Sequence, residues 1–238
     1  MGMRISVAWV ILVGFAFWSG TASAVTVSDP SDWASGWVYS TVEVSGTGTA
    51  GFVVLPAGGN PGARLASTTV TPTGADTAFG AALYQLASFA APTSGTPFVM
   101  HLDVLSGPGG FGQGQGVQVL VEQAGSVYQT SVGITGFPFN TFTTLTFNGT
   151  FIASAFVKVS GAGATNPSFD GVTPTTFGFA VGNSMSATLT QYYDNWNITF
   201  TSGAATSAAP VPTLSHAALP MLGLLIAIGA ILALRRRI

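Results

Sequence analysis

Apolar and polar side chains alternate along several short stretches of the chain between residues 25 and 203. Successive side chains of a β-strand point to opposite faces of a sheet. Each alternating stretch therefore predicts a strand with one buried face. The apolar positions that define the three clearest rows are Phe98, Met100, Leu102 and Val104; Val117, Val119 and Val121; and Phe177, Phe179 and Val181.

Turn signals separate these stretches. Asn148 and Gly149 stand between residues 142–147 and a fourth alternating run at 151–159, and they predict a two-residue hairpin because both tolerate positive φ. A second hairpin is expected at residues 123–126. Residues 78–90 are rich in Ala and Leu, which also suits a helix, but we assign them to a strand. Many short strands with Gly and Pro turns predict an all-β fold, an antiparallel sandwich or jelly roll.

An apolar run without alternation lies near the beginning of the chain. Residues 5–18 follow the positively charged Arg4 and precede Ala22, Ser23 and Ala24, an A-x-A pattern typical of signal-peptide cleavage sites. We therefore predict an N-terminal signal helix in residues 1–24, exported by the Sec machinery and cut after Ala24 by signal peptidase. An uncleaved anchor is the alternative.

A second apolar run lies near the end of the chain. Residues 217–234 contain no charged side chain, and Arg235, Arg236 and Arg237 follow them. A helix of this length spans roughly 27 Å, close to the thickness of a hydrocarbon core. The pattern predicts a single transmembrane helix whose arginines stop transfer on the cytoplasmic side; a buried helix of the globular part is the alternative. Residues 204–212, with small residues and prolines, predict a flexible linker.

The segment 211–238 joins a short box, this apolar run and the arginines. The box consists of Val211, Pro212, Thr213, Leu214 and Ser215. This layout resembles the IPTL-CTERM sorting signal, a relative of the PEP-CTERM tails of Gram-negative bacteria. In that family the box opens with Ile and continues with Glu-Trp, whereas here Val211 opens it and His216 and Ala217 follow.

The resemblance implies that an exosortase-type transpeptidase recognises and cuts the tail. The chain would then be held transiently in the inner membrane, with residues 25–203 as its periplasmic ectodomain, before delivery to the cell surface or the extracellular space. A stably anchored periplasmic protein, whose tail is not processed, is the alternative.

Composition narrows the classes of partner. The chain has no cysteine, so disulfides cannot stabilise an exported domain. All eight acidic residues but only two of the six basic residues lie in residues 25–203. This acidic balance argues against binding to nucleic acid or to anionic lipid.

Candidate catalytic chemistry is sparse. The glycine-rich residues 107–116 precede a predicted strand rather than a helix, which argues against a phosphate-binding loop. Glu43 and Glu122 are the only glutamates and lie far apart in sequence, and His101 is the only histidine of the ectodomain. We predict that the protein is not an enzyme; a glycan-active enzyme that uses an unrecognised carboxylate pair is the alternative.

One carboxylate interrupts an apolar row near the end of the ectodomain. That row is Tyr192, Asp194, Trp196, Ile198 and Phe200. If it faces the core, the carboxylate of Asp194 must be paired, hydrogen-bonded or bound to a metal. A structural Ca²⁺ ion, with Asp29 or Asp32 contributing oxygens, is one interpretation. An aspartate that accepts backbone N–H groups is the other, and no other cofactor is predicted.

The opposite face of the same stretch carries Tyr193, Asn195 and Asn197, an aromatic ring with polar neighbours. Aromatic rings can stack on the apolar face of a sugar, so these three residues are a candidate polysaccharide platform. Trp33, Trp37, Tyr128 and Trp196 are further aromatic candidates, although Trp196 falls in the predicted core row.

Three short motifs carry a second resemblance. They are Gly59-Asn60-Pro61-Gly62, Phe89-Ala90-Ala91-Pro92 and Tyr193-Asp194-Asn195-Trp196. They resemble the jelly-roll ectodomains of exported bacterial proteins with sorting tails, which are similar to carbohydrate-binding and laminin-type modules. The resemblance implies a fold and lends no catalytic residue. The sequence thus predicts an exported, non-catalytic surface or matrix protein with polysaccharide as its candidate ligand.

Overall fold

The computed structural model describes residues 24–29, 32–73, 76–89, 92–107, 115–131, 133 and 141–201. The predicted linker and sorting tail, and the predicted signal peptide before Ala24, lie outside these residues. So does most of the glycine-rich stretch after Gly107. In the part of the chain that is described, no helix is long and apolar enough to cross a membrane.

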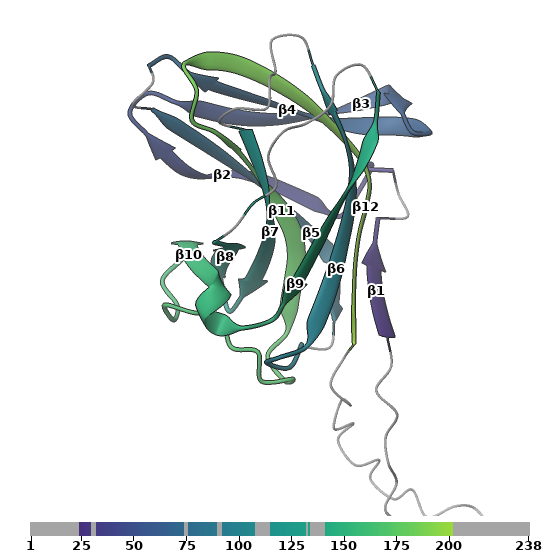
Figure 1. Ribbon diagram of the computed structural model, residues 1–238, viewed down its shortest axis with the longest axis vertical. Helices are drawn as coiled ribbons and strands as arrows, with labels where there is room; N and C mark the ends of the chain where they lie inside the picture. Colours follow the sequence, from purple (N-terminus) through teal and green to yellow (C-terminus); the bar gives the residue numbers. More distant parts are fainter. Residues whose placement is uncertain are drawn as a thin grey trace, which may run out of the picture.

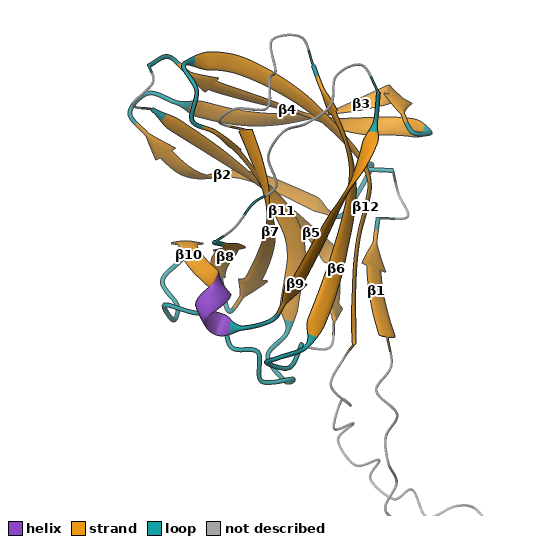
Figure 2. Ribbon diagram, in the orientation of Figure 1, coloured by secondary structure: helices purple, strands orange, loops and turns teal. Residues whose placement is uncertain are grey.

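The described residues form two packed antiparallel sheets, and strands dominate the fold (Figures 1 and 2). The first sheet has the order β3-β4-β12-β6-β9, and β1 pairs with the far end of β12. Its strands are β3 (Thr49–Gly59), β4 (Gly62–Thr71), β12 (Ala187–Thr201), β6 (Pro97–Ser106), β9 (Thr143–Thr150) and β1 (Ala24–Ser28).

The second sheet has the order β10-β8-β7-β11-β5-β2. Its strands are β10 (Phe156–Ser160), β8 (Ser126–Thr130), β7 (Gln115–Gln123), β11 (Thr175–Asn183), β5 (Thr77–Phe89) and β2 (Trp37–Ser45). The predicted all-β jelly-roll sandwich is therefore confirmed for the described residues. The assignment of residues 78–90 to a strand is also confirmed, because β5 covers nearly all of them.

The three clear apolar rows lie on the inner faces of the two sheets. Every side chain in them is at most 2% exposed, and all belong to one hydrophobic cluster. Phenylalanines fill much of the remaining space between the sheets; for example, the Phe151 ring centroid lies 5.5 Å from that of Phe200 and 6.4 Å from that of Phe156. Burial of these rows is the main stabilising term of a fold without disulfides.

The hairpin predicted at residues 123–126 is confirmed. It joins β7 to β8, with Gln123 facing Ser126. Ala124 and Gly125 have φ of 48° and 72°, and two consecutive positive values are what a tight turn of this hand requires.

The hairpin predicted at Asn148 and Gly149 is wrong. Both residues lie inside β9, opposite Val99 and Phe98 of β6. A Cβ atom on Gly149 would lie 2.3 Å from Cζ of Phe98, so the glycine leaves room for a core ring rather than for a turn.

The fourth apolar row, predicted at residues 151–159, is only partly correct. A 3₁₀ turn, η1 (Ala153–Ala155), interrupts the extended chain before β10. As a result Phe156 is buried whereas Val157 is 52% exposed, the reverse of the predicted alternation.

Candidate functional site

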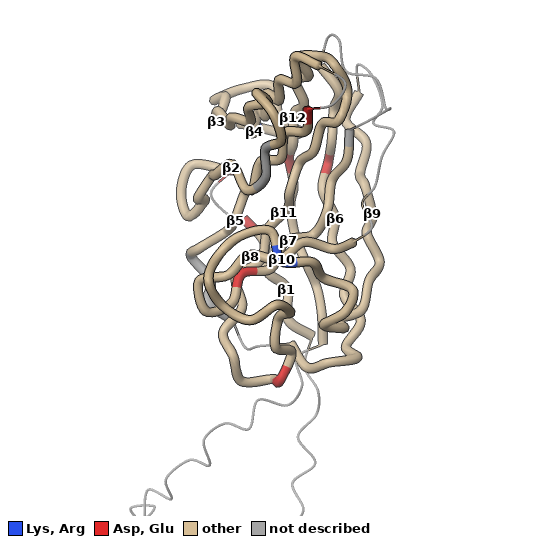
Figure 3. Tube along the Cα trace, turned by 90° about the vertical axis from the view of Figure 1, so that its left-hand side faces the viewer, with Lys and Arg blue, Asp and Glu red and all other residues tan. Residues whose placement is uncertain are grey.

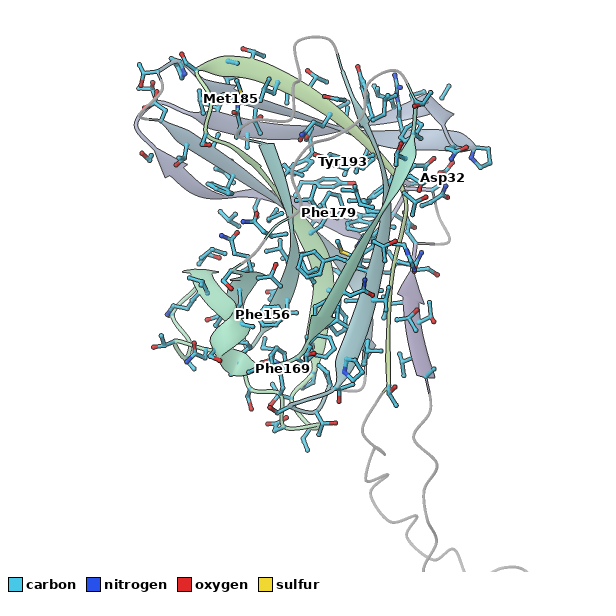
Figure 4. All side chains as sticks on the ribbon, viewed as in Figure 1. Asp32, Phe156, Phe169, Phe179, Met185 and Tyr193 are labelled. Atoms are coloured by element: carbon cyan, nitrogen blue, oxygen red, sulfur yellow. The ribbon has the colours of Figure 1, made fainter. Side chains whose placement is uncertain are left out.

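Three segments that are far apart in sequence meet at one side of the sandwich. They are the N-terminal residues 29–33, the tip of the β3–β4 hairpin at residues 58–62, and the middle of β12 at residues 194–196. Asp32 marks this side in Figure 4. Together they enclose a cleft of about 340 Å³, lined by Asp29, Asp32, Trp33, Pro61, Gly62, Asp194, Asn195 and Trp196.

A β-bulge in β12 shapes one wall of the cleft. Asp194 faces Asp103 of β6, but the next paired residue is Asn197, which faces His101. Asn195 has φ of 49°, a left-handed conformation that Asn tolerates better than most residues. The extra residue changes which side chains face inward, as bulges do.

The bulge overturns part of the predicted pattern of β12. Trp196, Ile198 and Phe200 face the core as predicted, but Tyr193 rather than Tyr192 takes the core position before the bulge. Tyr192 is half-buried instead, with the Arg64 guanidinium carbon 3.8 Å from its ring centroid.

Tyr193 therefore cannot serve as an accessible sugar platform in this structure, and that prediction is wrong. Its side chain is fully buried, and its ring centroid lies 5.1 Å from that of Phe179 between the sheets (Figure 4). Its hydroxyl donates to Oε1 of Gln191 at 2.5 Å and accepts from Oγ of Ser67 at 3.3 Å. Burial raises the pKa of Tyr193. Asn195 is exposed and Asn197 half-buried, so these two residues remain candidates for contact with a ligand.

The other aromatic candidates form the floor of the cleft or the core rather than an exposed surface. Trp33, Tyr128 and Trp196 are at most 3% exposed. The Trp37 ring centroid lies 4.7 Å from that of Trp33 and 5.1 Å from that of Trp196. Within the described chain, the buried Nε1 of Trp196 has no hydrogen-bond partner.

Asp194 is buried at the bulge, as its apolar neighbours in sequence predict. The backbone N–H of Asn60 donates to its Oδ2, and the backbone N–H of Asn195 donates to its Oδ1 at 2.8 Å. Burial raises the pKa of Asp194, while these two N–H groups and the Trp33 side chain oppose that rise. Of the two interpretations of Asp194, the structure shows the acceptor of backbone N–H groups.

The two N-terminal aspartates lie at the same cleft, as predicted. Oδ2 of Asp29 accepts from the backbone N–H of Trp33 at 2.6 Å and from Nε1 of Trp37 at 2.9 Å. Oδ2 of Asp32 accepts from the backbone N–H of Ala63 at 2.6 Å. Asp32 and Trp33 have φ of 53° and 68°, so strained backbone gathers on this side of the cleft as well.

Metal binding at Asp194 stays a prediction. Across the described ranges, no three His, Asp or Glu side chains are grouped so that they could hold a metal ion.

Glycines let the hairpin tip approach the carboxylates. A Cβ atom on Gly59 would lie 2.7 Å from Oδ2 of Asp194, and one on Gly62 would lie 2.2 Å from Oδ2 of Asp32. Gly62 also has φ of 92°, which disfavours any other residue. The backbone of the motif Gly59-Asn60-Pro61-Gly62 therefore packs directly against the carboxylates of Asp194 and Asp32, and only glycine leaves room for this approach.

A hydrogen-bond network connects the cleft to the outer face of β6. Nδ2 of Asn195 donates to the carbonyl oxygen of Asn60 at 2.5 Å and to Oδ2 of Asp103 at 2.8 Å. Nδ2 of Asn60 donates to the same Oδ2 of Asp103 at 3.1 Å, and Oγ1 of Thr144 donates to Oδ1 at 2.5 Å. Asp103 is thus fully engaged in fixing the bulge.

The candidates for acid–base chemistry have structural partners instead. Nδ1 of His101 lies 3.1 Å from Oγ1 of Thr146, and Oε2 of Glu122 accepts from Nε2 of Gln85 at 2.9 Å. The Glu43 side chain lies outside the described part of the chain, so the alternative of a carboxylate pair is not tested by this geometry.

The comparisons with known proteins concern the tail and the fold separately. The IPTL-CTERM motif matches residues 209–237. No curated protein matches the chain. Among solved structures, the family 11 carbohydrate-binding module of the cellulosomal cellulase Lic26A-Cel5E of Clostridium thermocellum is 10% identical, with a TM-score of 0.44 over 76% of this chain and 96% of that chain. The CBM22-1 xylan-binding domain from Paenibacillus barcinonensis Xyn10C is 10% identical, with a TM-score of 0.39 over 76% and 97%.

Proposed function

We propose that this chain is an exported, non-catalytic protein that a C-terminal sorting signal delivers to the cell surface or the extracellular matrix, and that its sandwich binds polysaccharide at the cleft. The observation that carries the proposal is the match of the IPTL-CTERM motif to residues 209–237. The motif coincides with the box at 211–215, the apolar run at 217–234 and the terminal arginines.

The route of export follows from the two ends of the chain. The Sec machinery exports the chain and signal peptidase cuts it after Ala24. The apolar run 217–234 holds the tail in the inner membrane, and Arg235, Arg236 and Arg237 stop transfer. An exosortase-type enzyme then cuts near Val211–Ser215 and releases the ectodomain with its linker, residues 204–212.

The cleft offers the chemistry that a neutral sugar chain needs. Sugar hydroxyls can donate to the carboxylates of Asp29 and Asp32 and to Oδ1 of Asn195, whose Nδ2 already donates to Asn60 and Asp103. Its volume of about 340 Å³ lies at the lower end of the range for small-ligand sites. Asn197 lies on the same strand just beyond the cleft. We place the ligand in the cleft and beside Asn197 rather than on the buried ring of Tyr193.

Two carboxylates with structural partners support a non-catalytic protein, while Asp29, Asp32 and Asp194 accept backbone N–H groups at the cleft and the Glu43 side chain lies outside the described residues. Glu122 is held by Gln85, and Asp103 by Thr144, Asn60 and Asn195. A glycosidase needs two carboxylates facing the scissile bond and free to act on it.

A structural Ca²⁺ ion at Asp194 is a second candidate ligand of the cleft. Asp29 and Asp32 also line the cleft, but the three carboxylates are not grouped as a metal site in the described residues, so backbone carbonyl oxygens or water would have to complete the coordination. Ca²⁺ prefers carboxylate and carbonyl oxygens and would offset the charge of Asp194, whose pKa burial raises. The test is the melting temperature of the exported protein in Ca²⁺ and in EGTA. A rise of several degrees that saturates with Ca²⁺ and disappears in Asp194→Asn supports the ion, whereas equal values in both buffers exclude it.

The test of the sorting proposal is the intact mass of the protein in the membrane, periplasmic and extracellular fractions of cells. We expect a mature form that begins at Val25 and ends near residues 211–215, outside the inner membrane. Pro212→Ala should accumulate a membrane-bound precursor, whereas Pro174→Ala, a substitution in an exposed turn of the ectodomain, should be processed normally. A wild-type species that keeps Arg235–Arg237 in the membrane would show that the tail is only an anchor.

The test of polysaccharide binding is affinity electrophoresis of the mature protein in gels that contain neutral polysaccharides, including xylan and mixed-linked β-glucan. We expect Asp32→Asn to weaken retention about tenfold, because one polar contact to a ligand is worth 1 to 2 kcal/mol. Asn148→Ala, an exposed change on β9, should not alter it. Equal retention of the two variants would show that the polysaccharide does not bind in the cleft.

A further inference from the structure

Strand β3 lies at the margin of its sheet. It pairs with β4 on one side only, and in Figure 3 it lies beside β4 on the side away from β12. The ladder with β4 is regular over residues 49–55 and then shifts register before Gly59. A marginal strand presents backbone N–H and C=O groups that can pair with another strand.

The regular part of β3 lacks charge, proline and a bulge, although Oγ1 of Thr41 on β2 donates to the backbone carbonyl oxygen of Ala50 at 3.3 Å. No charged residue occurs between residues 44 and 63. Val53 is 61% exposed and Val54 is 36% exposed, although both are β-branched residues that favour strands. The proline that could interrupt pairing, Pro56, comes only after the regular ladder. Natural sheets usually protect such an edge with lysine, proline or a bulge within it.

The other marginal strands are better protected. β10 is only five residues long and carries Lys158. β9 exposes Thr143, Thr144, Thr146 and Asn148, which are polar. β2 carries Glu43. β1 is also marginal but has five residues. β2 and β10 expose Val38 and Val157, but both strands contain a charged residue, so of the described margins β3 is the longest and combines exposed valines with the absence of charge.

We propose that β3 pairs with β3 of a second copy of this chain, antiparallel and across a two-fold axis, so that two sheets join into one. A two-fold axis makes a single segment its own partner, so no second complementary sequence is needed. Cross-strand pairs of β-branched side chains such as Val53 stabilise such a ladder.

The distribution of charge favours the antiparallel arrangement. The acidic cleft lies beside the tip of the β3–β4 hairpin, six residues beyond Val53. With the axis near Val53, the two clefts would lie on the order of 40 Å apart at opposite ends of the joined strands, at about 3.3 Å per residue. This separation exceeds the screening length of about 8 Å, so the carboxylates of the two copies would not repel each other strongly.

Seven paired residues on each copy make a small interface, below the roughly 1,200 Å² of a stable complex. The pairing is therefore reversible in dilute solution and becomes effective where copies are concentrated, as on a surface or in a matrix. It is independent of the cleft and of any ligand that binds there.

Single-cysteine cross-linking of the full chain in cells tests the proposal directly. The natural sequence has no cysteine, so an introduced one can form a disulfide only with another copy or another protein. We would place a cysteine in turn at each residue from 50 to 55, oxidise mildly and measure disulfide-linked dimer by non-reducing electrophoresis. Val172→Cys is the matched control, because Val172 is 74% exposed on a turn outside both sheets.

The proposal expects a sharp profile. Only a residue at the axis faces its own counterpart, and a shift of two residues separates the equivalent Cα atoms by about 13 Å, beyond the reach of a disulfide. The best position should give at least about fivefold more dimer than positions two residues away and than Val172→Cys. Adding Val54→Lys (Val53→Lys if the peak is at residue 54) should abolish the peak, whereas Val172→Lys should not.

Two results would overturn the proposal: no dimer above the control at any scanned position, or a flat profile that Val54→Lys leaves unchanged. Because Val53 and Val54 are exposed, these substitutions leave the core intact, and secretion of each variant at the wild-type level verifies folding.

Discussion

Two aspartates in well-separated parts of the sandwich, Asp170 and Asp194, have opposite environments (Figure 4 labels their neighbours Phe169 and Asp32). Asp170 is exposed and accepts from the backbone N–H groups of Val172 and Thr173 at 2.8 and 2.7 Å. The hydroxyls of Thr173 and Ser168 donate to it as well. Asp194 is 2% exposed, and two further aspartates line its cleft.

The physical consequences are opposite. Donors without burial hold the pKa of Asp170 well below its usual range, chiefly through the backbone N–H of Thr173. Burial raises the pKa of Asp194 despite its donors. Hydrogen bonds within the turn stabilise the ionised carboxylate of Asp170. Burial in the cleft instead makes ionisation of Asp194 unfavourable for the folded state.

Backbone strain follows the same division. Of the described non-glycine residues with positive φ, Asp32, Trp33 and Asn195 border the cleft, and Ala124 lies in a hairpin turn. Strain of this kind persists only where the surroundings enforce it, and it is frequent at functional sites. The comparison therefore supports the cleft as the candidate functional site and indicates a local structural role for the turn.

The largest expected effect is that of Asp194→Ala. It leaves the backbone N–H groups of Asn60 and Asn195 without their acceptor inside a buried site, at a cost of about 3 kcal/mol in the free energy of unfolding. Urea unfolding of the ectodomain measures this loss. Asp170→Ala is the control and should cost clearly less, because water can replace an exposed carboxylate. Equal losses would mean that the cleft is no more constrained than the turn.

A smaller effect is expected for Gly62→Ala, compared with Gly95→Ala. Both glycines have positive φ, of 92° and 86°, so both substitutions carry a backbone cost of about 1 kcal/mol. A Cβ atom at Gly62 would also meet Oδ2 of Asp32 at 2.2 Å, whereas one at Gly95 meets nothing within 4 Å. Gly62→Ala should therefore cost about 1 kcal/mol more, and this excess should vanish in an Asp32→Ala background. If the extra cost of Gly62→Ala persists in the Asp32→Ala background, the added Cβ atom clashes with a group other than Asp32.

Much of the fold could be predicted from the sequence because alternation is a local signal. Phe98, Val119 and Phe179 face the core where the period of two places them. The turn at Ala124 and Gly125 was also predicted correctly, since its φ requirement is carried by those two residues alone.

The errors arose where a long-range contact overrides the local pattern. Gly149 looks like a turn residue, but its role is to admit the ring of Phe98 from another strand. The bulge at Asn195 is fixed by Asn60 and Asp103, which lie 135 and 92 residues away in sequence, and it reverses the expected places of Tyr192 and Tyr193. The sequence predicts a buried Asp194 only if its row faces the core; Asp194 is buried, although the bulge moves Tyr192 of that row away from the core position.

The smallest effect is a difference in the pH dependence of stability between Asp170→Asn and Asp194→Asn, each compared with the wild type. The lowered pKa of Asp170 contributes stability above its unfolded pKa of about 3.9, and this stability is lost as the pH falls toward the folded pKa. The raised pKa of Asp194 acts in the opposite direction: the folded state binds more protons, so stability falls as the pH rises from about 3.9 through the folded pKa.

Melting temperatures of the wild type and both variants between about pH 2 and 7 separate these two effects. As the pH rises, the melting temperature of the wild type should increase relative to that of Asp170→Asn at the acidic end of the range. Above pH ~4 it should decrease relative to that of Asp194→Asn. Asparagine does not titrate, so the slope of each difference reports one carboxyl group, whatever constant cost the lost hydrogen bonds add. Two slopes of the same sign would mean that backbone donors outweigh burial at Asp194, and the cleft would then be a second structural turn rather than a strained site.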